Sequence, residues 1–350
     1  MVGIDNRRLE RRGYRKSLLF AVLNRSQFAA KSKYKEGSNY MEKVNVLVIG
    51  AGIMGHSIAM DFAAHGYPTT LYDKSAEQLE MAKKLVAGNV QLLESEDMIT
   101  AEGVKNVDDL LVYTDKLEDA AKKAKFVVEA VPEVPDIKKS VFAELDKLCS
   151  PDTIFTSTTS ALNIYDVVEV SNPGRLIIGH FNNPAHIIPL VEVVMGPETS
   201  QETLEYVKKV YESLDHVPVV LKQYTIGFIV NRLNTALARE ANYIVEQGWA
   251  TPEDVDKAIT NNAGLKLAFE GPLELYDHIG WDLAKLGGTF LAPMLCNTTA
   301  TALPDKLVAE GNLGVKTGKG LKDYTGLDRV EVQNARNRKI LKVIRTVKQF

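Results

Sequence analysis

The sequence is poor in cysteine and has no long apolar run. Its two cysteines, Cys149 and Cys296, lie far apart, so no disulfide framework is predicted and a reducing compartment is favoured. Neither cysteine stands in a metal-ligand spacing, and no H-E-x-x-H motif occurs, so no metal site is predicted. No stretch approaches the roughly 18 consecutive apolar residues of a membrane span. Membrane insertion is therefore not expected.

The chain also lacks a strong excess of either charge. Its 42 Lys and Arg residues nearly balance 45 Asp and Glu residues, which gives a net charge of −3. A nucleic-acid partner has no global electrostatic support and is not predicted. With 45% hydrophobic and 25% charged residues, the composition is that of a globular protein, and 350 residues fit two domains.

Residues 1–40 differ from the rest of the chain in charge. They hold ten Lys and Arg residues against three Asp and Glu residues, and the apolar patterns of regular elements begin only after Met41. We interpret them as a basic, disordered extension, and the expected location of the protein is then the cytoplasm. The alternative is a transit peptide, because such segments are basic and poor in acids, and the location would then be the mitochondrial matrix.

A glycine-rich turn after the first buried strand is the feature around which the chain is organised. The run Val46–Ile49 is apolar without interruption, as in a strand buried on both faces of a parallel sheet. It leads into the motif GAGIMG and then into a helical pattern from Met54 to His65. In such a turn the first glycine permits the tight bend, the second admits a pyrophosphate, and the third allows helix and strand to pack closely. The predicted cofactor contacts in the turn are Gly50, Gly52, Ile53, Met54 and Gly55.

An acid at the end of the second strand indicates which dinucleotide binds. Gly66 ends the helix, the strand Thr69–Tyr72 follows, and Asp73 comes next. This is the position of the carboxylate that hydrogen-bonds an adenosine ribose, and a carboxylate there would repel the 2′-phosphate of NADP. Strand, turn, helix, strand and acid in this order predict a dinucleotide site with NAD as the cofactor.

Strand and helix patterns alternate along residues 41–224. This alternation predicts an α/β Rossmann-type doubly wound domain. Residues 225–326 have almost wholly helical patterns and are predicted to be an all-α C-terminal domain, in which Thr251 and Pro252 mark a helix start. Residues 327–350 are predicted to form a basic tail helix. The further helical patterns of the first domain are Ala76 to about Leu93, Lys116–Ala124, Asp136–Leu148 and Glu202–Leu214, and its further strand patterns are Lys125–Val131, Thr153–Thr158, Arg175–Gly179, Leu190–Val194 and Val217–Leu221.

A histidine and an acid stand close together near one strand end. His180 ends an apolar strand where a loop begins, and Glu192 stands within a run of Leu and Val. An ionised carboxylate in such surroundings is costly unless it is paired. A His–Glu pair would remove that cost, raise the basicity of the imidazole, and form a general base for a hydroxyl proton while hydride leaves the same carbon. The alternative is a structural histidine in the core with an unrelated acid.

Two further polar residues are candidates for the cleft. Ser160 follows the strand Thr153–Thr158 and could supply a hydroxyl there, with a helix N-cap as the alternative. Asn231 stands early in the first helix of the second domain, where an amide could face either the cleft or plain solvent. The remaining histidines are weaker candidates: His56, His65, His186, His216 and His278.

These segments together resemble the 3-hydroxyacyl-CoA dehydrogenase family, from about Lys43 to Tyr324. The motifs that carry the resemblance are GAGIMG, EAVPE, TSTTSALNI, GHFNNPAHIIPLVEVV, GFIVNRL and KTGKG. In this family the second domain is helical and forms a homodimer.

The resemblance also implies roles for individual residues. His180 would be the catalytic base and Glu192 its partner. Ser160 and Asn231 would position the substrate oxygen. The residues implied to contact the nicotinamide half of NAD are Glu133, Lys138 and Asn183.

Departures from the family pattern bear on the substrate. Where the family usually reads S-N-T-S, this chain has Ser157-Thr158-Thr159-Ser160, so Thr158 replaces an amide near the cofactor. The helix after Asp73, which in acyl-CoA enzymes offers a serine and lysines to CoA, is followed here by an acidic stretch that includes Glu94, Glu96 and Asp97. The segment 264–273 looks more like the lambda-crystallin and gulonate dehydrogenase branch.

The predicted activity is NAD-dependent oxidation of an L-3-hydroxyacyl-CoA, such as 3-hydroxybutyryl-CoA, to the 3-ketoacyl-CoA, a reaction of fatty acid metabolism. One alternative keeps this chemistry on a free 3-hydroxy acid such as gulonate or carnitine. The other is a non-catalytic NAD-binding protein of the crystallin kind. The joint presence of His180, Glu192, Ser160 and Asn231 argues against that last alternative.

Overall fold

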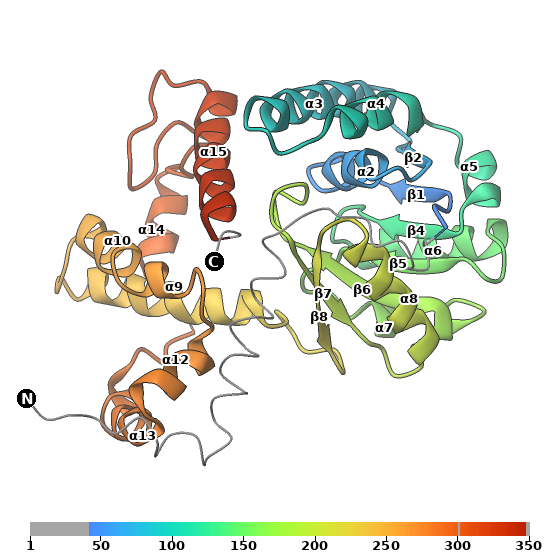
Figure 1. Ribbon diagram of the computed structural model, residues 1–350. Coiled ribbons are helices and arrows are strands. Elements are labelled where there is room, and N and C mark those ends of the chain that lie inside the picture. The colour runs from blue at the N-terminus through green and yellow to red at the C-terminus, as the bar shows by residue number, and fades with distance from the viewer. Residues whose placement is uncertain (1–41, 300–301, 348–350) are drawn as a thin grey trace, which may run out of the picture. The chain divides into compact units, whose positions relative to one another are not determined.

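The fold was obtained as a computed structural model that describes residues 42–299 and 302–347 (Figure 1). Of these residues, those up to Leu237 form one compact unit, and those from Ala238 onward form a second. The division falls within helix α9 (Val230–Glu246). The predicted extension of residues 1–40 lies outside the described residues, and the predicted domain bounds stay predictions.

Eight strands form one sheet in the part of the chain that the structure describes, in the order β3-β2-β1-β4-β5-β6-β7-β8. Neighbouring strands are parallel from β3 through to β6, β7 runs antiparallel to β6, and β8 runs parallel to β7. The predicted Rossmann-type domain is thereby confirmed. The strands are β1 (Val46–Ile49), β2 (Thr69–Tyr72), β3 (Leu111–Thr114), β4 (Phe126–Glu129), β5 (Ile154–Ser157), β6 (Leu176–Phe181), β7 (Leu190–Val194) and β8 (Val217–Leu221).

Helices cover both faces of this sheet. On one face, Phe142 of a helix packs with Phe155 of β5 in a cluster that also buries Leu47 of β1. On the other face, Phe126 of β4 contacts the rings of Phe62 and of Tyr211, which come from two different helices. Apolar side chains on both faces explain why the central strand β1 is a continuous apolar run. The helices of this unit are α2 (Gly55–Ala64), α3 (Ala76–Ser95), α4 (Ala101–Leu110), α5 (Leu117–Lys123), α6 (Pro135–Leu148), α7 (Ile164–Val167), α8 (Gln201–Glu212) and the 3-10 turn η2 (Pro173–Arg175).

Helix α4 and strand β3 were not expected from the sequence, which shows an acidic polar stretch there. Thr100 caps α4 by accepting a hydrogen bond from the Gly103 N–H at 3.0 Å. Strand β3 lies at the edge of the sheet, where Leu111 is buried and Val112 is 56% exposed. A short edge strand with one buried side chain leaves little apolar pattern to detect.

The second unit is helical, as predicted. Thr251 caps α10 by accepting a hydrogen bond from the Asp254 N–H at 3.2 Å, which confirms the predicted helix start. Helix α15 lies where the basic tail helix was expected. No helix within residues 42–299 and 302–347 is long and apolar enough to cross a membrane. The elements after α9 are α10 (Pro252–Thr260), α11 (Ala263–Lys266), α12 (Pro272–Ile279), α13 (Trp281–Phe290), η3 (Ala292–Met294), α14 (Ala302–Ala309) and α15 (Arg329–Val347).

Candidate functional site

The three glycines of the turn between β1 and α2 differ in what a side chain would meet. A Cβ on Gly55 would lie 1.7 Å from the carbonyl oxygen of Gly50. Gly50 has φ of +97°, and a Cβ there would lie 2.7 Å from the carbonyl oxygen of Ala130. A Cβ on Gly52 would meet no atom within 4 Å. Only the space above Gly52 is therefore open, as close approach of a pyrophosphate requires.

Asp73 is held in a fixed orientation beside this turn. Its Oδ2 accepts a hydrogen bond from the Ala51 N–H at 2.9 Å, and its Oδ1 accepts one from the Ser75 N–H at 2.9 Å. Gln78 Nε2 donates to the carbonyl oxygen of Ala51 at 3.0 Å and fixes the turn from the other side. Each carboxylate oxygen of Asp73 keeps accepting capacity for the hydroxyl groups of a ribose.

A pocket of about 870 Å³ opens above the turn. Ile53 contributes an apolar side chain that is 68% exposed at this opening. The same pocket is lined by predicted residues of the turn and by Glu133 and Ser160. Predicted residues on its walls are Gly50, Gly52, Ile53, Met54, Asp73, Glu133 and Ser160.

Lys138 is not on the pocket wall but is 1% exposed within the protein. Its Nζ donates to both oxygens of Glu129, at 2.7 and 2.9 Å, and lies 3.2 Å from Oε2 of Glu133. Sequence reasoning missed Glu129, which was visible only as one polar interruption of an apolar strand. That Lys138 itself contacts the cofactor stays a prediction.

Glu133 organises the loop that carries Ser160. Its Oε1 accepts hydrogen bonds from Thr159 Oγ1 at 2.5 Å and from the Ser160 N–H at 3.0 Å. Partial burial alone would raise the pKa of Glu133, but the Thr159 hydroxyl, the Lys138 charge and backbone N–H groups lower it to about 2. Glu133 is therefore ionised at neutral pH, and Ser160 is held by a fixed charge.

The structure brings His180 and Glu192 into contact. They face each other in the register of the antiparallel pair β6 and β7, and His180 Nδ1 lies 2.9 Å from Glu192 Oε2. Both side chains are buried, at 6% and 0% exposed. Because Glu192 is a hydrogen-bond acceptor, this contact leaves His180 Nε2 as the nitrogen available to a substrate.

The start of α9 completes this pair. Oε1 of Glu192 accepts hydrogen bonds from the backbone N–H groups of Ile229 and Val230, at 2.8 and 3.1 Å. Burial would raise the pKa of Glu192, but the bonds from His180 and these two N–H groups lower it below its ordinary value. The Phe228 ring packs on His180 with centroids 5.2 Å apart.

Asn231 and Asn183 were also predicted site residues. Asn231 follows Val230 at the start of α9, so it lies one residue from a group that holds Glu192. Asn183 is exposed, two residues after the end of β6, and its peptide bond to Pro184 is cis. Neither of the two, nor His180 or Glu192, lies on the walls of the pocket above the turn.

A second set of polar contacts joins α2 to the loop after His180, and the sequence did not suggest it. Ser57 Oγ lies 2.6 Å from His186 Nδ1 and accepts a hydrogen bond from the His186 N–H at 3.1 Å. Burial lowers the pKa of His186 to about 4, so its imidazole is neutral. On the same helix, Asp61 Oδ2 lies 2.7 Å from His216 Nε2. Ser57 and His186 are 129 positions apart, and Asp61 and His216 are 155 positions apart. Sequence patterns over short windows cannot show such pairings.

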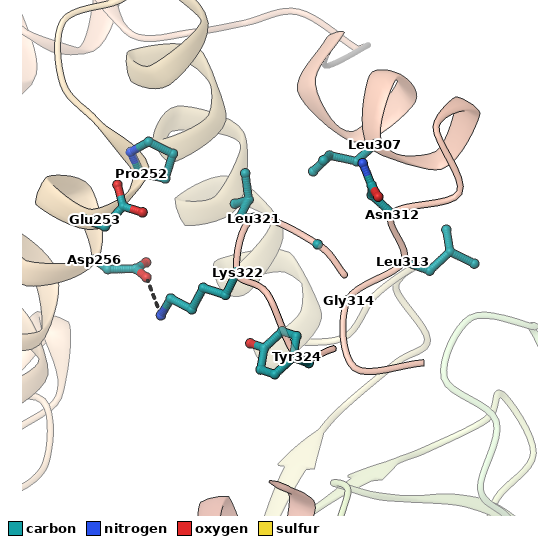
Figure 2. A pocket seen from close by; sticks show the side chains of 11 residues that line it. Pro252, Glu253, Asp256, Leu307, Asn312, Leu313, Gly314, Leu321, Lys322 and Tyr324 are labelled. Carbon is teal, nitrogen blue, oxygen red and sulfur yellow. Dashed lines mark hydrogen bonds and ion pairs between the residues drawn. The ribbon is translucent and has the colours of Figure 1, made fainter. Parts of the chain in front are cut away.

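Another pocket, of about 390 Å³, lies in the helical unit between α10 and the loop after α14 (Figure 2). Its wall includes Asp256 and Lys322, whose charged groups lie 3.4 Å apart, together with Tyr324. None of the predicted site residues lines it. In the described part of the chain, no three His, Cys, Asp or Glu side chains are grouped so that they could hold a metal ion.

Family sequence models match most of the chain. Residues 45–224 match the NAD-binding domain of 3-hydroxyacyl-CoA dehydrogenase, and residues 227–324 match its C-terminal domain. The open space at Gly52 and the oriented carboxylate of Asp73 fit such a cofactor. The prediction of an NAD-dependent oxidoreductase is thereby confirmed.

Individual relatives differ in the substrates that their names give. The 5-formyl-3-hydroxy-2-methylpyridine 4-carboxylate 5-dehydrogenase of Mesorhizobium japonicum is 34% identical over 304 residues, which cover 86% of this chain and 97% of that protein. L-carnitine dehydrogenase of Streptomyces griseus is 34% identical over 278 residues, covering 75% of this chain and 81% of that protein.

Solved structures agree with the sequence matches. The crystal structure of 5-formyl-3-hydroxy-2-methylpyridine 4-carboxylic acid 5-dehydrogenase has a TM-score of 0.80 and 32% identity, covering 87% of this chain and 99% of that chain. The structure of 3-hydroxybutyryl-CoA dehydrogenase from Escherichia coli has a TM-score of 0.68 and 35% identity. The match covers 82% of this chain and 61% of that chain. The protein therefore belongs to the 3-hydroxyacyl-CoA dehydrogenase family.

Proposed function

We propose that this protein oxidises the 3-hydroxyl group of an L-3-hydroxyacyl substrate to a ketone, with His180 as the general base and Glu192 as its partner. The observation that carries the proposal is the buried contact between His180 Nδ1 and Glu192 Oε2, at 2.9 Å. When bound, NAD⁺ supplies the acceptor for the hydride that leaves C3. The chain itself has to remove the hydroxyl proton and hold the substrate oxygen.

His180 removes the proton through Nε2. Its Nδ1–H donates to Glu192, so Nε2 carries no proton in the neutral imidazole and can accept one. The imidazolium that forms is stabilised by the carboxylate of Glu192, which is held by the backbone N–H groups of Ile229 and Val230 at the start of α9. A base of this kind contributes about 10²–10⁴-fold to the rate.

Ser160 and Asn231 are proposed to hold the substrate oxygen. Ser160 is exposed on the pocket wall, and its backbone is fixed by Glu133. Asn231 follows Val230, whose N–H donates to Glu192. Each side chain therefore sits next to an anchored group, which favours reproducible positioning of a reacting oxygen.

The first candidate substrate is a CoA thioester, because the family models that match residues 45–224 and 227–324 describe acyl-CoA enzymes. The second candidate is a free 3-hydroxy acid. Helix α3 carries only two basic residues, Lys83 and Lys84, and Lys83 Nζ already lies 2.6 Å from Glu80. Acidic residues stand at and just after its end, and they are poor neighbours for the phosphates of CoA. The names of the two relatives given above also denote substrates without CoA.

NADH formation by the purified protein tests the proposal. L-3-hydroxybutyryl-CoA, L-carnitine and L-gulonate would be offered in parallel, with NAD⁺ in excess. Turnover of the thioester alone supports the first candidate, and turnover of a free acid alone supports the second. Tight NAD⁺ binding with no turnover of any 3-hydroxy compound would contradict the proposal and favour a non-catalytic role.

The proposal includes a homodimer formed through the helical unit. Helix α13 presents Leu283, Leu286 and Phe290 on one face, and these side chains are 54%, 53% and 66% exposed. Such an apolar face is typical of an interaction surface. Sedimentation velocity should give a dimer, and Leu286→Glu should shift it to the monomer. A monomeric wild-type protein would contradict this part of the proposal.

A further inference from the structure

Glu129 is a buried acid at the end of the central strand β4, with 0% of its surface exposed. Its carboxylate accepts hydrogen bonds from Lys138 Nζ, at 2.7 and 2.9 Å, and from Ser157 Oγ, at 2.5 Å. The Val131 N–H donates to it as well, at 2.8 Å. With all these donors the carboxylate is fully satisfied and fixed in place.

Two routes lead from Glu129 to the loop that follows β5. The first passes through Ser157, whose Oγ also accepts a hydrogen bond from the backbone N–H of Thr159 in that loop, at 3.2 Å. The second passes through Lys138, whose Nζ lies 3.2 Å from Oε2 of Glu133. The other oxygen of Glu133 accepts hydrogen bonds from the backbone of Ser160, Ala161 and Leu162. Both routes therefore end on the backbone of residues 159–162, the loop segment that carries Ser160.

This cluster lies at one end of the cofactor pocket. Strand β1 stands between β2 and β4, so the turn at Gly52 has Asp73 on one side and residues 130–133 on the other. A dinucleotide with its adenosine ribose at Asp73 and its pyrophosphate over Gly52 extends its nicotinamide half towards residues 130–133. Glu133 and Ser160 line the pocket at that end.

The cluster has one negative charge in excess, because the carboxylates of Glu129 and Glu133 face the single ammonium of Lys138. The nicotinamide ring is positively charged in NAD⁺ and neutral in NADH. A net negative charge beside the ring therefore stabilises the oxidised cofactor more than the reduced one.

We propose that Glu129 is a positioning residue of the hydride transfer: it fixes Glu133 and the Ser160 loop, and its charge raises the affinity for NAD⁺ relative to NADH. The inference rests on NAD use and on the place of the nicotinamide half, and it does not depend on the identity of the substrate. Binding measurements without substrate therefore test it separately from the proposed function.

The test compares wild type with Glu129→Gln and Glu129→Asp. Dissociation constants for NAD⁺ and NADH would be measured by calorimetry on the whole chain. Glu129→Gln removes one charge and should lower the NAD⁺ to NADH affinity ratio about fivefold. Glu129→Asp keeps the charge and should preserve the ratio, even where the shorter side chain weakens both affinities. A loss of affinity that is equal for both forms in Glu129→Gln would overturn the proposal.

Asp146→Asn is a matched control. Asp146 forms an ion pair with Arg175, which is 3% exposed, and Asp146 does not line the cofactor pocket. Its loss should lower stability and leave the affinity ratio unchanged. If Glu129→Gln does not fold, Glu133→Gln removes one negative charge from the same cluster at an exposed position and should lower the ratio in the same direction. An unchanged ratio in that variant would also contradict the proposal.

Discussion

Glu192 lies opposite His180 in the pairing of β6 and β7, and its Oε2 lies 2.9 Å from the imidazole Nδ1. Its second oxygen accepts two backbone N–H groups at the start of α9. One carboxylate thus orients the imidazole and is itself oriented by the helix. Both oxygens of this buried acid are hydrogen-bonded, so the pair can hold a proton on His180 without rearrangement.

Glu192→Gln should lower kcat about 100-fold, in the range of general-base contributions. A glutamine can still accept the N–H groups of α9 through its oxygen. Its NH₂ group would then face His180 Nδ1 and favour the tautomer with the proton on Nε2, which cannot act as a base. The measurement is kcat across pH 5 to 10 for both proteins. A variant with wild-type kcat and an unchanged pH profile would rule out the partnership.

Gly52→Ala and Gly55→Ala should separate cofactor binding from stability. A Cβ on Gly52 meets no atom within 4 Å, so the variant should keep its Tm within about 2 °C and lose at least tenfold in NAD⁺ affinity. A Cβ on Gly55 lies 1.7 Å from a carbonyl oxygen, so that variant should lose about 3 kcal/mol or more of unfolding free energy. Calorimetric titration and thermal unfolding measure both. Full NAD⁺ affinity in Gly52→Ala would mean that the pyrophosphate lies elsewhere.

Asp73→Asn should weaken the preference for NAD⁺ over NADP⁺. The carboxylate of Asp73 is held by the N–H groups of Ala51 and Ser75, and its charge would repel a 2′-phosphate. We expect the NADP⁺ to NAD⁺ affinity ratio to rise at least about tenfold once this repulsion is removed. Titration with each cofactor gives the ratio, and an unchanged value would show that other groups set the specificity.

The stability of the domain should depend on pH through His65. Burial opposes the charge on this imidazole, but the hydrogen bond and charge of Asp61 outweigh it and raise the pKa of His65 to about 9 from an ordinary value of 6.5. A raised folded-state pKa stabilises the fold fully below pH 6.5, and the contribution is lost as the pH rises through about 9. His65→Gln should therefore cost about 1 kcal/mol of unfolding free energy at pH 6 and almost none at pH 10. Urea unfolding of both proteins at pH 6 and pH 10 measures this difference. An equal loss of unfolding free energy at the two pH values would show that the charge of His65 does not stabilise the fold.

Much of the fold followed from local patterns in the sequence. Strand β1 coincides with its predicted range because a strand covered on both faces is apolar throughout. Helix α4 and strand β3 escaped prediction because α4 buries only Gly103 and Val107, and β3 is an edge strand with one buried side chain. Apolar periodicity reports burial, so elements with little burial leave little signal.

Part of the candidate site could be predicted from a local motif, as for Gly52 and Asp73, and part from a residue that contradicts its surroundings. Glu192 could be identified because an acid inside an apolar strand needs a partner. Glu129 interrupts an apolar strand in the same way, and the same reasoning would have found it. The contact of Ser57 with His186 spans 129 residues and joins two segments that no sequence pattern connects, so only the fold brings it into view.

The central claim is that His180 is the base for oxidation of a 3-hydroxyl group. The most direct test measures NADH formation and NAD⁺ affinity for wild type and His180→Gln, with L-3-hydroxybutyryl-CoA and the free 3-hydroxy acids as substrates. We predict turnover of one substrate by wild type, a fall in kcat of at least about 100-fold in the variant, and an NAD⁺ dissociation constant within about twofold of wild type. A variant that oxidises the same substrate at the wild-type rate would contradict the account.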